Sequence, residues 1–220
     1  AEARAIEKGL EGAEYTVGEL KKGKRSKQPT PAFITSTLQQ EASRRLGFTA
    51  TRTMRAAQTL YEGVDIAGHG TMGLITYMRT DSVNLSSLAI NTTKDEIVKT
   101  LGERYLHIRN YHTHTKGAQE AHEAIRPTYI SHHEINASSQ EKRLYELIWK
   151  RTIASQMSDA ELEKTTATIA VSGRKEHFVA VGEVLKFDGF LRVYNESSDD
   201  ENENGESNSK MLPPLQTGES

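Results

Sequence analysis

The sequence predicts an α+β chain in which a mainly helical domain is inserted into a β-rich domain formed by both chain ends. In the middle of the chain, apolar residues recur at helical spacing. Nearer the C-terminus, Thr165–Val171 and His177–Val184 alternate β-branched and aromatic residues with others, as strands do. Tyr15–Leu20 is a further short candidate strand near the N-terminus. Because the two β-rich stretches are far apart in sequence, we expect the helical part to be an insertion between two limbs of one domain.

The helical domain is expected at residues 37–158, between a first limb at residues 1–36 and a second limb at residues 159–220. In its first helix Leu38 and Leu46 share one face, and the preceding Ser36 predicts a capping box with Gln39. The other helices are expected from Thr51 to Glu62, from after Ser86 as far as Gly102, from Gln119 to Ile125 and from Ser139 to Met157.

Composition excludes several classes of protein. The chain has no cysteine, which rules out a disulfide scaffold, a thiolate zinc site, an iron–sulfur cluster and a cysteine nucleophile. No apolar run approaches the ~20 residues that a membrane span needs, so we expect no membrane partner. The N-terminus has neither an initiator Met nor the layout of a signal peptide, which indicates an internal piece of a longer chain.

Charge is distributed unevenly behind a formal net charge of −2 from 28 basic and 30 acidic residues. A basic run at Lys21–Lys27 is expected to be either a flexible connector or a loop that contacts phosphates. Glu196–Glu206 is acidic and poor in apolar residues, so residues 195–210 are predicted to be a solvated acidic loop, to which we assign no role.

The segment Gly73–Asn84, GLITYMRTDSVN, is the best candidate for chemistry. A tyrosine hydroxyl has an ordinary pKa near ~10, so Tyr77 needs a cation or base to act as a nucleophile at neutral pH. Arg79 follows two residues later and would lie on the same side of an extended segment, where it could stabilise a phenolate or a phosphate. The alternative that the pair leaves open is a packed ring beside a surface cation.

A second cluster is QEAHEAIRPT at Gln119–Thr128. On a helix, His122 and Arg126 would share one patch and form a phosphate-binding pair. The alternative is an ordinary helix end with a surface or core histidine. The cluster lacks the second histidine of a zinc protease, and His112 and His114 match no ligand spacing, so we expect no metal site in this chain.

Taken together, these motifs resemble the bacterial type IA DNA topoisomerases. The resemblance depends on five blocks in the family's order: FITSTLQQEASRRLGF at Phe33–Phe48, LITYMRTDS at Leu74–Ser82, QEAHEAIRPT at Gln119–Thr128, LYELIWKRTIASQM at Leu144–Met157 and FDGF at Phe187–Phe190. It implies that the helical domain bears the active-site tyrosine and that the two limbs belong to the arch, or gate, domain.

The resemblance also implies a mechanism. Tyr77 matches the tyrosine that attacks a single-strand phosphodiester, forms a 5′-phosphotyrosine link and releases a 3′-hydroxyl; strand passage and religation then relax negative supercoils without ATP. Arg79 matches the arginine that positions the scissile phosphate, and His122 matches a histidine that assists cleavage. Further contacts with DNA are expected from Thr76, Thr80, Asp81, Arg126 and Arg44.

In the family, Mg²⁺ is bound by a toprim domain that nothing in these 220 residues resembles. The chain is therefore expected to bind no cofactor, and to be inactive without the remaining domains of the enzyme. Expected partners are those domains and single-stranded or negatively supercoiled DNA, in the cytoplasm with the nucleoid. Two alternatives stay open: a non-catalytic DNA-binding module, and a purely structural or interaction domain.

Overall fold

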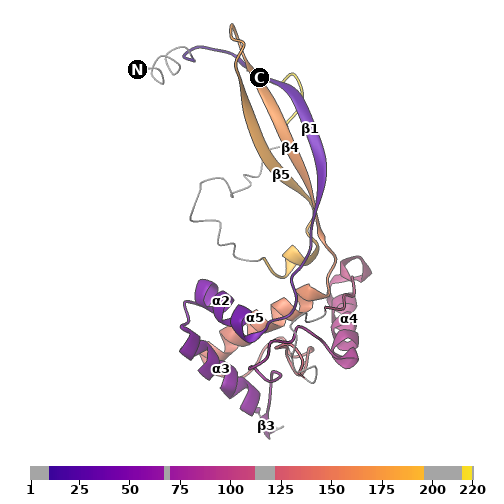
Figure 1. Ribbon diagram of the computed structural model, residues 1–220. Coiled ribbons are helices and arrows are strands. Elements are labelled where there is room, and N and C mark those ends of the chain that lie inside the picture. Colours follow the sequence, from indigo (N-terminus) through magenta and orange to yellow (C-terminus); the bar gives the residue numbers. More distant parts are fainter. Residues whose placement is uncertain (1–9, 67–69, 112–121, 196–214, 220) are drawn as a thin grey trace. The chain divides into compact units, whose positions relative to one another are not determined.

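The computed structural model describes residues 10–66, 70–111, 122–195 and 215–219 (Figure 1). The chain divides into two compact units. One comprises Ala1–Lys27, Ala160–Asp188 and Ser198–Ser220, and the other comprises Gln28–Asp159 and Gly189–Ser197. The first unit is built on a β-sheet and the second mainly on helices, so the α+β class is confirmed.

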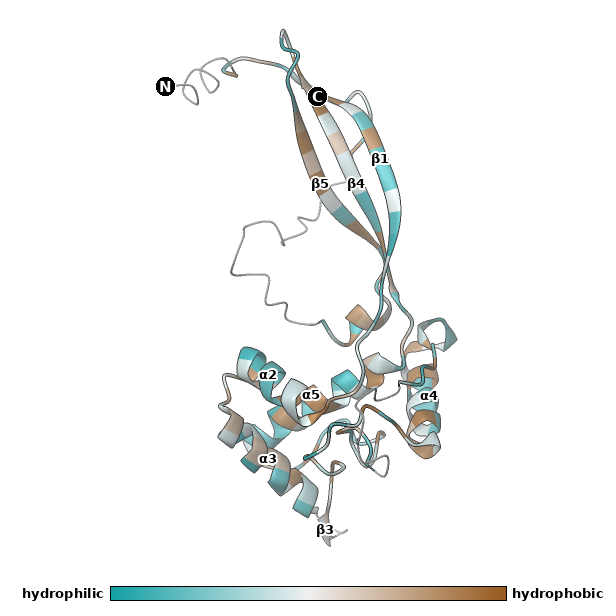
Figure 2. Ribbon diagram, in the orientation of Figure 1, coloured by the Kyte–Doolittle hydropathy of each residue, from teal (hydrophilic) through white to brown (hydrophobic). Residues whose placement is uncertain are grey.

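Three long antiparallel strands form the sheet, in the order β1-β4-β5. They are β1 (Tyr15–Lys27), β4 (Ala160–Val171) and β5 (His177–Phe187), and both chain ends therefore contribute to one sheet, as expected. Each strand is longer than its sequence pattern indicated. Figure 2 shows β1 as mainly hydrophilic and β5 as more apolar.

The basic run is part of strand β1, so the prediction that it forms a connector or loop is wrong. Cross-strand carboxylates explain why a strand accepts so many cations. Glu163 of β4 lies between Lys22, at 3.6 Å, and Lys186, at 3.3 Å. Arg25 reaches Glu183 of β5 at 2.5 Å. Opposite charges that face each other across strands stabilise the pairing, so these cations are largely compensated within the sheet.

The helical unit contains α2 (Thr35–Leu46), α3 (Ala50–Glu62), α4 (Ser87–Leu101) and α5 (Ser139–Ser155). A small hairpin of β2 (Val64–Ile66) and β3 (Gly70–Met72) follows α3. Helix α5 contacts α2, α3 and α4 and supplies much of the core, which is why it is buried over most of its length (Figure 1). The fully buried side chains of this unit include Phe33, Leu38, Leu60 and Ile97, together with Leu144 and Ile148 of α5. None of the helices in the described residues is long and apolar enough to cross a membrane.

Two helix predictions need correction. The first helix begins at Thr35, before the expected start, and its first turn is closed by the Thr37 hydroxyl, which accepts from the Ile34 N–H at 3.1 Å, instead of by a Ser36–Gln39 pair. The helix expected at 119–125 is absent from its described part, residues 122–125, and the remainder lies outside the described residues. There the backbone pairs with other segments, and this pairing competes with helix formation.

A buried polar cluster ties the returning chain to α2. The short 3-10 helix Gly189–Arg192 is followed by Tyr194, whose hydroxyl donates to Glu41 of α2 at 2.8 Å. Arg45 binds the same carboxylate at 2.8 Å, which offsets the cost of burying it. Burial raises the pKa of Tyr194 well above its usual range, so the phenol stays protonated and remains the donor in this bond.

Gly189 should be the least replaceable residue of the FDGF block. It has a positive φ of 48°, and an added Cβ would overlap the carbonyl oxygen of Asp159. Replacing it with alanine therefore combines an unfavourable backbone conformation with a clash, and should lower the free energy of unfolding by about 3 kcal/mol. Denaturant unfolding of the 220-residue chain measures this.

Gly173, in the β4–β5 turn, is the matched control for that substitution. Its φ is 72°, but nothing lies within 4 Å of an added Cβ. Gly173→Ala should cost only the conformational part, about 1 kcal/mol. If the two variants lost equal free energy of unfolding, the overlap with the Asp159 carbonyl would contribute nothing to the destabilisation of Gly189→Ala.

Candidate active site

The segment that contains Tyr77 is held by backbone pairing with residues that lie far away in sequence. The Thr76 N–H donates to the Arg126 carbonyl at 2.9 Å, and the Thr128 N–H donates to the Leu74 carbonyl at 2.9 Å. Ile75 pairs antiparallel with Pro127 in an isolated bridge. The two blocks of sequence, Leu74–Ser82 and Gln119–Thr128, thus meet in the fold because their backbones satisfy each other's hydrogen bonds.

The hydroxyl of Thr76 reinforces this pairing. It donates to the Ala124 carbonyl at 2.6 Å and accepts from the Arg126 N–H at 3.0 Å. Thr76 is therefore committed to the protein on both its donor and its acceptor side, which suits a residue that positions its neighbour Tyr77.

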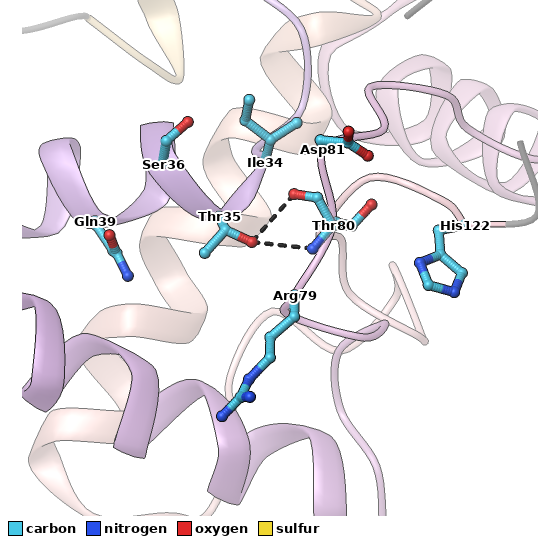
Figure 3. Close-up of a pocket in the computed structure, with 8 residues that line it drawn as sticks. All are labelled: Ile34, Thr35, Ser36, Gln39, Arg79, Thr80, Asp81 and His122. Carbon is cyan, nitrogen blue, oxygen red and sulfur yellow. Dashed lines mark hydrogen bonds between the residues drawn. The ribbon is translucent and has the colours of Figure 1, made fainter. Parts of the chain in front are cut away.

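A second clamp fixes the other end of the segment. Thr35, the first residue of α2, donates through its hydroxyl to the Met78 carbonyl at 2.8 Å and accepts from the Thr80 N–H at 2.9 Å. The Thr35 N–H donates to the Thr80 carbonyl at 3.0 Å. Figure 3 shows the Thr35 hydroxyl facing the backbone of Thr80. Thr80 itself is buried, and its hydroxyl accepts from the Ser82 N–H at 3.0 Å.

Between these clamps the side chain of Tyr77 points outward. The residue is 40% exposed, whereas its neighbours Ile75 and Met78 are buried. Its ring packs nearly perpendicular to the His122 ring, with centroids 5.8 Å apart, and against the Tyr61 ring of α3, with centroids 5.3 Å apart. Within the described part of the chain, its hydroxyl has no hydrogen-bond partner.

Figure 3 shows a pocket of this unit, with a volume of about 500 Å³. It is lined by Ile34, Thr35, Ser36, Gln39, Arg79, Thr80, Asp81 and His122. Four of the expected site residues, Arg79, Thr80, Asp81 and His122, thus line one open cavity, and Tyr77 adjoins it through the contact with His122. The sequence patterns did not predict that Ile34, Thr35, Ser36 and Gln39 would line a pocket. All four belong to the Phe33–Phe48 block that resembles the family, and this block was the feature of the sequence that could have indicated them.

Arg79 is the exposed cation of this pocket. Its guanidinium makes no ion pair or hydrogen bond with any other residue that the structure describes. In Figure 3 its side chain extends away from the carboxylate of Asp81. An unpaired guanidinium in an open pocket retains its donors for a ligand, and its planar fork matches the oxygens of a phosphate.

Arg126 lies elsewhere. Its side chain is only 12% exposed, and it is paired with Glu123 at 2.6 Å, so it does not line this pocket. Because residues 122–125 are not helical, the helical patch predicted for His122 and Arg126 does not form. Arg126 instead lines a separate cavity with α4 residues such as Leu88 and Lys99.

Arg44 is also separate from the pocket. It lies in the last turn of α2 and pairs with the buried Glu41 at 3.3 Å. Both of these arginines have a carboxylate partner, unlike Arg79.

The residues that the structure describes do not provide a metal site. No group of three histidine or acidic side chains among them is placed to hold a metal ion. Asp81 is the one carboxylate that lines the pocket. Mg²⁺ is held in enzymes by carboxylates together with substrate phosphates and water, so a single carboxylate is a poor fit and we derive no step through a metal. His112 and His114 lie outside the described residues.

Comparison with known proteins gives this site a family. The sequence model of the DNA topoisomerase family matches residues 1–220, and the chain belongs to that family. Its relatives place it with the bacterial type IA enzymes named DNA topoisomerase 1, as the sequence motifs indicated. It is 48% identical over 224 residues to DNA topoisomerase 1 of Rickettsia typhi, covering 99% of this chain and 28% of that protein.

Other relatives agree. The chain is 44% identical over 225 residues to DNA topoisomerase 1 of Xylella fastidiosa (strain Temecula1), covering 100% of this chain and 27% of that protein. It matches the structure of full-length topoisomerase I from Thermotoga maritima with a TM-score of 0.78 and 34% identity, covering 99% of this chain and 34% of that one. The chain thus spans under a third of the length of these curated relatives.

Glu123 should make the stability of the fold depend on pH. Burial alone would raise the pKa of Glu123, but hydrogen bonds from Arg126 and Ser86 outweigh it and hold the pKa below its ordinary value of 4.5. A lowered pKa in the folded state means that the carboxylate stabilises the fold above about pH 4.5 and that this stabilisation is lost as the pH falls further.

The Glu123→Gln variant tests this linkage. At pH 7 it should unfold more readily than the unchanged chain, by about 1 kcal/mol, because the charge-assisted bonds are lost. Below about pH 4.5 the difference should narrow, because the carboxyl group of the unfolded chain then binds a proton, whereas the folded carboxylate does so only at its lower pKa. Denaturant titrations at a series of pH values from about 3 to about 7 measure this difference. A difference that stays constant with pH would contradict the prediction.

Proposed function

We propose that this chain provides the nucleophile for transient cleavage of single-stranded DNA in a type IA topoisomerase, with Tyr77 as the attacking residue. The observation that supports it best is the pairing of an exposed tyrosine with a pocket that holds an uncompensated guanidinium and a histidine. The family membership and the match to the family's tyrosine block point the same way. The substrate would be a phosphodiester of negatively supercoiled DNA in the cytoplasm, where the nucleoid lies.

The proposed step exchanges one phosphodiester for another. The Tyr77 oxygen forms a bond to phosphorus as the bond from phosphorus to the 3′ oxygen breaks. The tyrosine loses its proton, and the released 3′ oxygen gains one. The product is a 5′-phosphotyrosine and a 3′-hydroxyl, and attack by that hydroxyl reverses the step. Because the ester is retained throughout, strand passage and religation need no ATP.

Each pocket residue has a distinct part in this proposal. Arg79 would bind the non-bridging oxygens of the scissile phosphate and neutralise the charge that develops on them. His122 contacts the Tyr77 ring and would hold the adjacent DNA backbone or assist proton transfer. Thr76 and Thr80 fix the backbone around the nucleophile, and Asp81 borders the pocket.

For DNA contact, Arg44 and Arg126 are weaker candidates than Arg79. A phosphate would have to compete with Glu41 for Arg44, and with Glu123 for Arg126. Their guanidinium groups are therefore proposed to stabilise the helical unit chiefly, with any contribution to DNA binding secondary to that of Arg79.

The nucleophile assignment is tested by Tyr77→Phe in a complete topoisomerase I that contains this segment. The variant should form no covalent complex, because the attacking oxygen is gone, while single-stranded oligonucleotides should bind within about threefold of the unchanged enzyme, since the ring remains. An oligonucleotide labelled at its 3′ end reports the protein–DNA adduct, and one labelled at its 5′ end reports the fragment with a free 3′-hydroxyl.

Tyr129→Phe is the matched control, because Tyr129 is similarly exposed, at 43%, and does not line the pocket. It should cleave normally. If Tyr77→Phe still relaxes supercoiled DNA, the chain is instead a non-catalytic DNA-binding module, which is the second candidate function.

The isolated 220-residue chain is expected not to relax supercoiled DNA. In the proposal, the groups that bind Mg²⁺ and protonate the leaving 3′ oxygen belong to a different domain of the enzyme. Incubating the chain with negatively supercoiled plasmid and Mg²⁺, followed by gel electrophoresis, measures this, and a complete topoisomerase I serves as the positive control. Relaxation by the chain that disappears in its Tyr77→Phe variant would mean that these residues suffice for the reaction.

A further inference from the structure

The ring of Tyr61 lies against the ring of Tyr77, at the C-terminal end of α3. The two centroids are 5.3 Å apart and the ring planes meet at 63°, an edge-to-face arrangement that aromatic pairs favour. Tyr61 is itself 42% exposed, so it contacts Tyr77 at the surface and is not part of the buried core.

Ring contacts are what the described structure offers to orient Tyr77. No described residue bonds the Tyr77 hydroxyl, which leaves the oxygen available to a substrate but does not fix its direction. Among the described residues, the two rings that touch Tyr77 are those of Tyr61 and His122. A half-exposed phenol with no hydrogen bond would otherwise sample several rotamers, because it loses little by leaving any one of them.

The backbone holds Tyr61 in register with the nucleophile. The Leu74 N–H donates to the Leu60 carbonyl at 2.7 Å, which joins the end of α3 to the start of the Tyr77 segment. At Gly73, an added Cβ would lie 2.7 Å from the Tyr61 carbonyl oxygen. The two segments of the chain therefore approach so closely that only glycine fits at this position. The β2–β3 hairpin between them leaves and returns to this point, pairing Val64 with Met72.

From this geometry we infer that Tyr61 is a positioning residue for the nucleophile: its ring, fixed to the Tyr77 backbone through Gly73 and Leu74, restricts the Tyr77 side chain to the orientation from which its oxygen attacks. This inference rests on the proposed function of Tyr77. It concerns the ring of Tyr61 and not its hydroxyl, because the contact is made between rings.

Two other roles for Tyr61 make different predictions. If its exposed ring stacked on a DNA base, losing it would weaken binding of single-stranded DNA. If it merely stabilised the fold, losing it would lower the melting temperature of the chain, and the site would be intact in the molecules that remain folded. A positioning role predicts a slower cleavage step with unchanged binding and folding.

The test uses Tyr61→Leu and Tyr61→Phe in a complete topoisomerase I that contains this segment. Cleavage of a 3′-labelled oligonucleotide is followed under single-turnover conditions, and its dissociation constant is measured separately. We expect Tyr61→Leu to slow cleavage about tenfold, as a misplaced nucleophile does, with binding changed by less than about twofold. Tyr61→Phe keeps the ring and should cleave at close to the unchanged rate.

Tyr129→Leu is the matched control, since Tyr129 is equally exposed and contacts a histidine ring, His132, at 5.4 Å. It should leave cleavage unchanged. Unaltered cleavage in Tyr61→Leu, a parallel loss of binding, or an equal defect in Tyr61→Phe would each overturn the inference. Tyr77→Phe is measured alongside: if it still cleaves, the proposed function fails, whereas a defect in Tyr77→Phe without one in Tyr61→Leu removes the positioning role alone.

A measurement on the 220-residue chain itself does not depend on activity. Carbon-13 relaxation of labelled tyrosine reports the side-chain order of Tyr77. That order should fall in Tyr61→Leu and be retained in Tyr61→Phe, with both variants melting at temperatures close to that of the unchanged chain. A Tyr77 side chain that is equally ordered in the leucine variant would contradict the inference.

Discussion

The placement of the candidate site depends on the backbone pairing between residues 74–76 and 124–128. Neither segment belongs to a regular helix or to the main sheet, so each would otherwise expose unpaired N–H and C=O groups. The hydrogen bonds between Thr76 and Arg126 and between Thr128 and Leu74 satisfy these groups, and the Thr76 hydroxyl adds two more. Through this pairing Tyr77 and His122 become neighbours, although they come from separate blocks of sequence.

Basic side chains that are paired with carboxylates stabilise the fold, whereas a basic side chain without such a partner is available to bind a ligand. On β1 the basic side chains Lys22 and Arg25 have carboxylate partners on β4 and β5, respectively. In the helical unit Arg44 and Arg126 likewise have glutamate partners. Arg79 differs from these four in making no such contact with the described residues. A net charge near zero therefore conceals a pocket in which one guanidinium is available.

The insertion of the helical unit into the β-rich unit requires the chain to leave and return at nearly the same place. Lys27, the last residue of β1, is paired with Ala160, the first residue of β4, so the chain leaves the sheet and re-enters it at paired positions. After β5 the FDGF block returns the chain to the helical unit, where Gly189 fits against Asp159 and Phe190 is buried. This block of the family resemblance thus has a structural reason that is independent of DNA.

Periodicity and residue type determined the α+β class, most of the helices and the presence of three strands, though not their full length, and made Tyr77 a candidate to which the family resemblance gave the role of nucleophile. These features depend on local patterns: an apolar face, a capping residue, a terminating glycine or an unusual polar turn. Only the tertiary structure decided that residues 122–125 are not helical, that Arg126 is paired with Glu123, and that Tyr61 lies against Tyr77. Each of these results from a pairing between distant segments, and such pairings compete with local preference without leaving a periodic signal in the sequence.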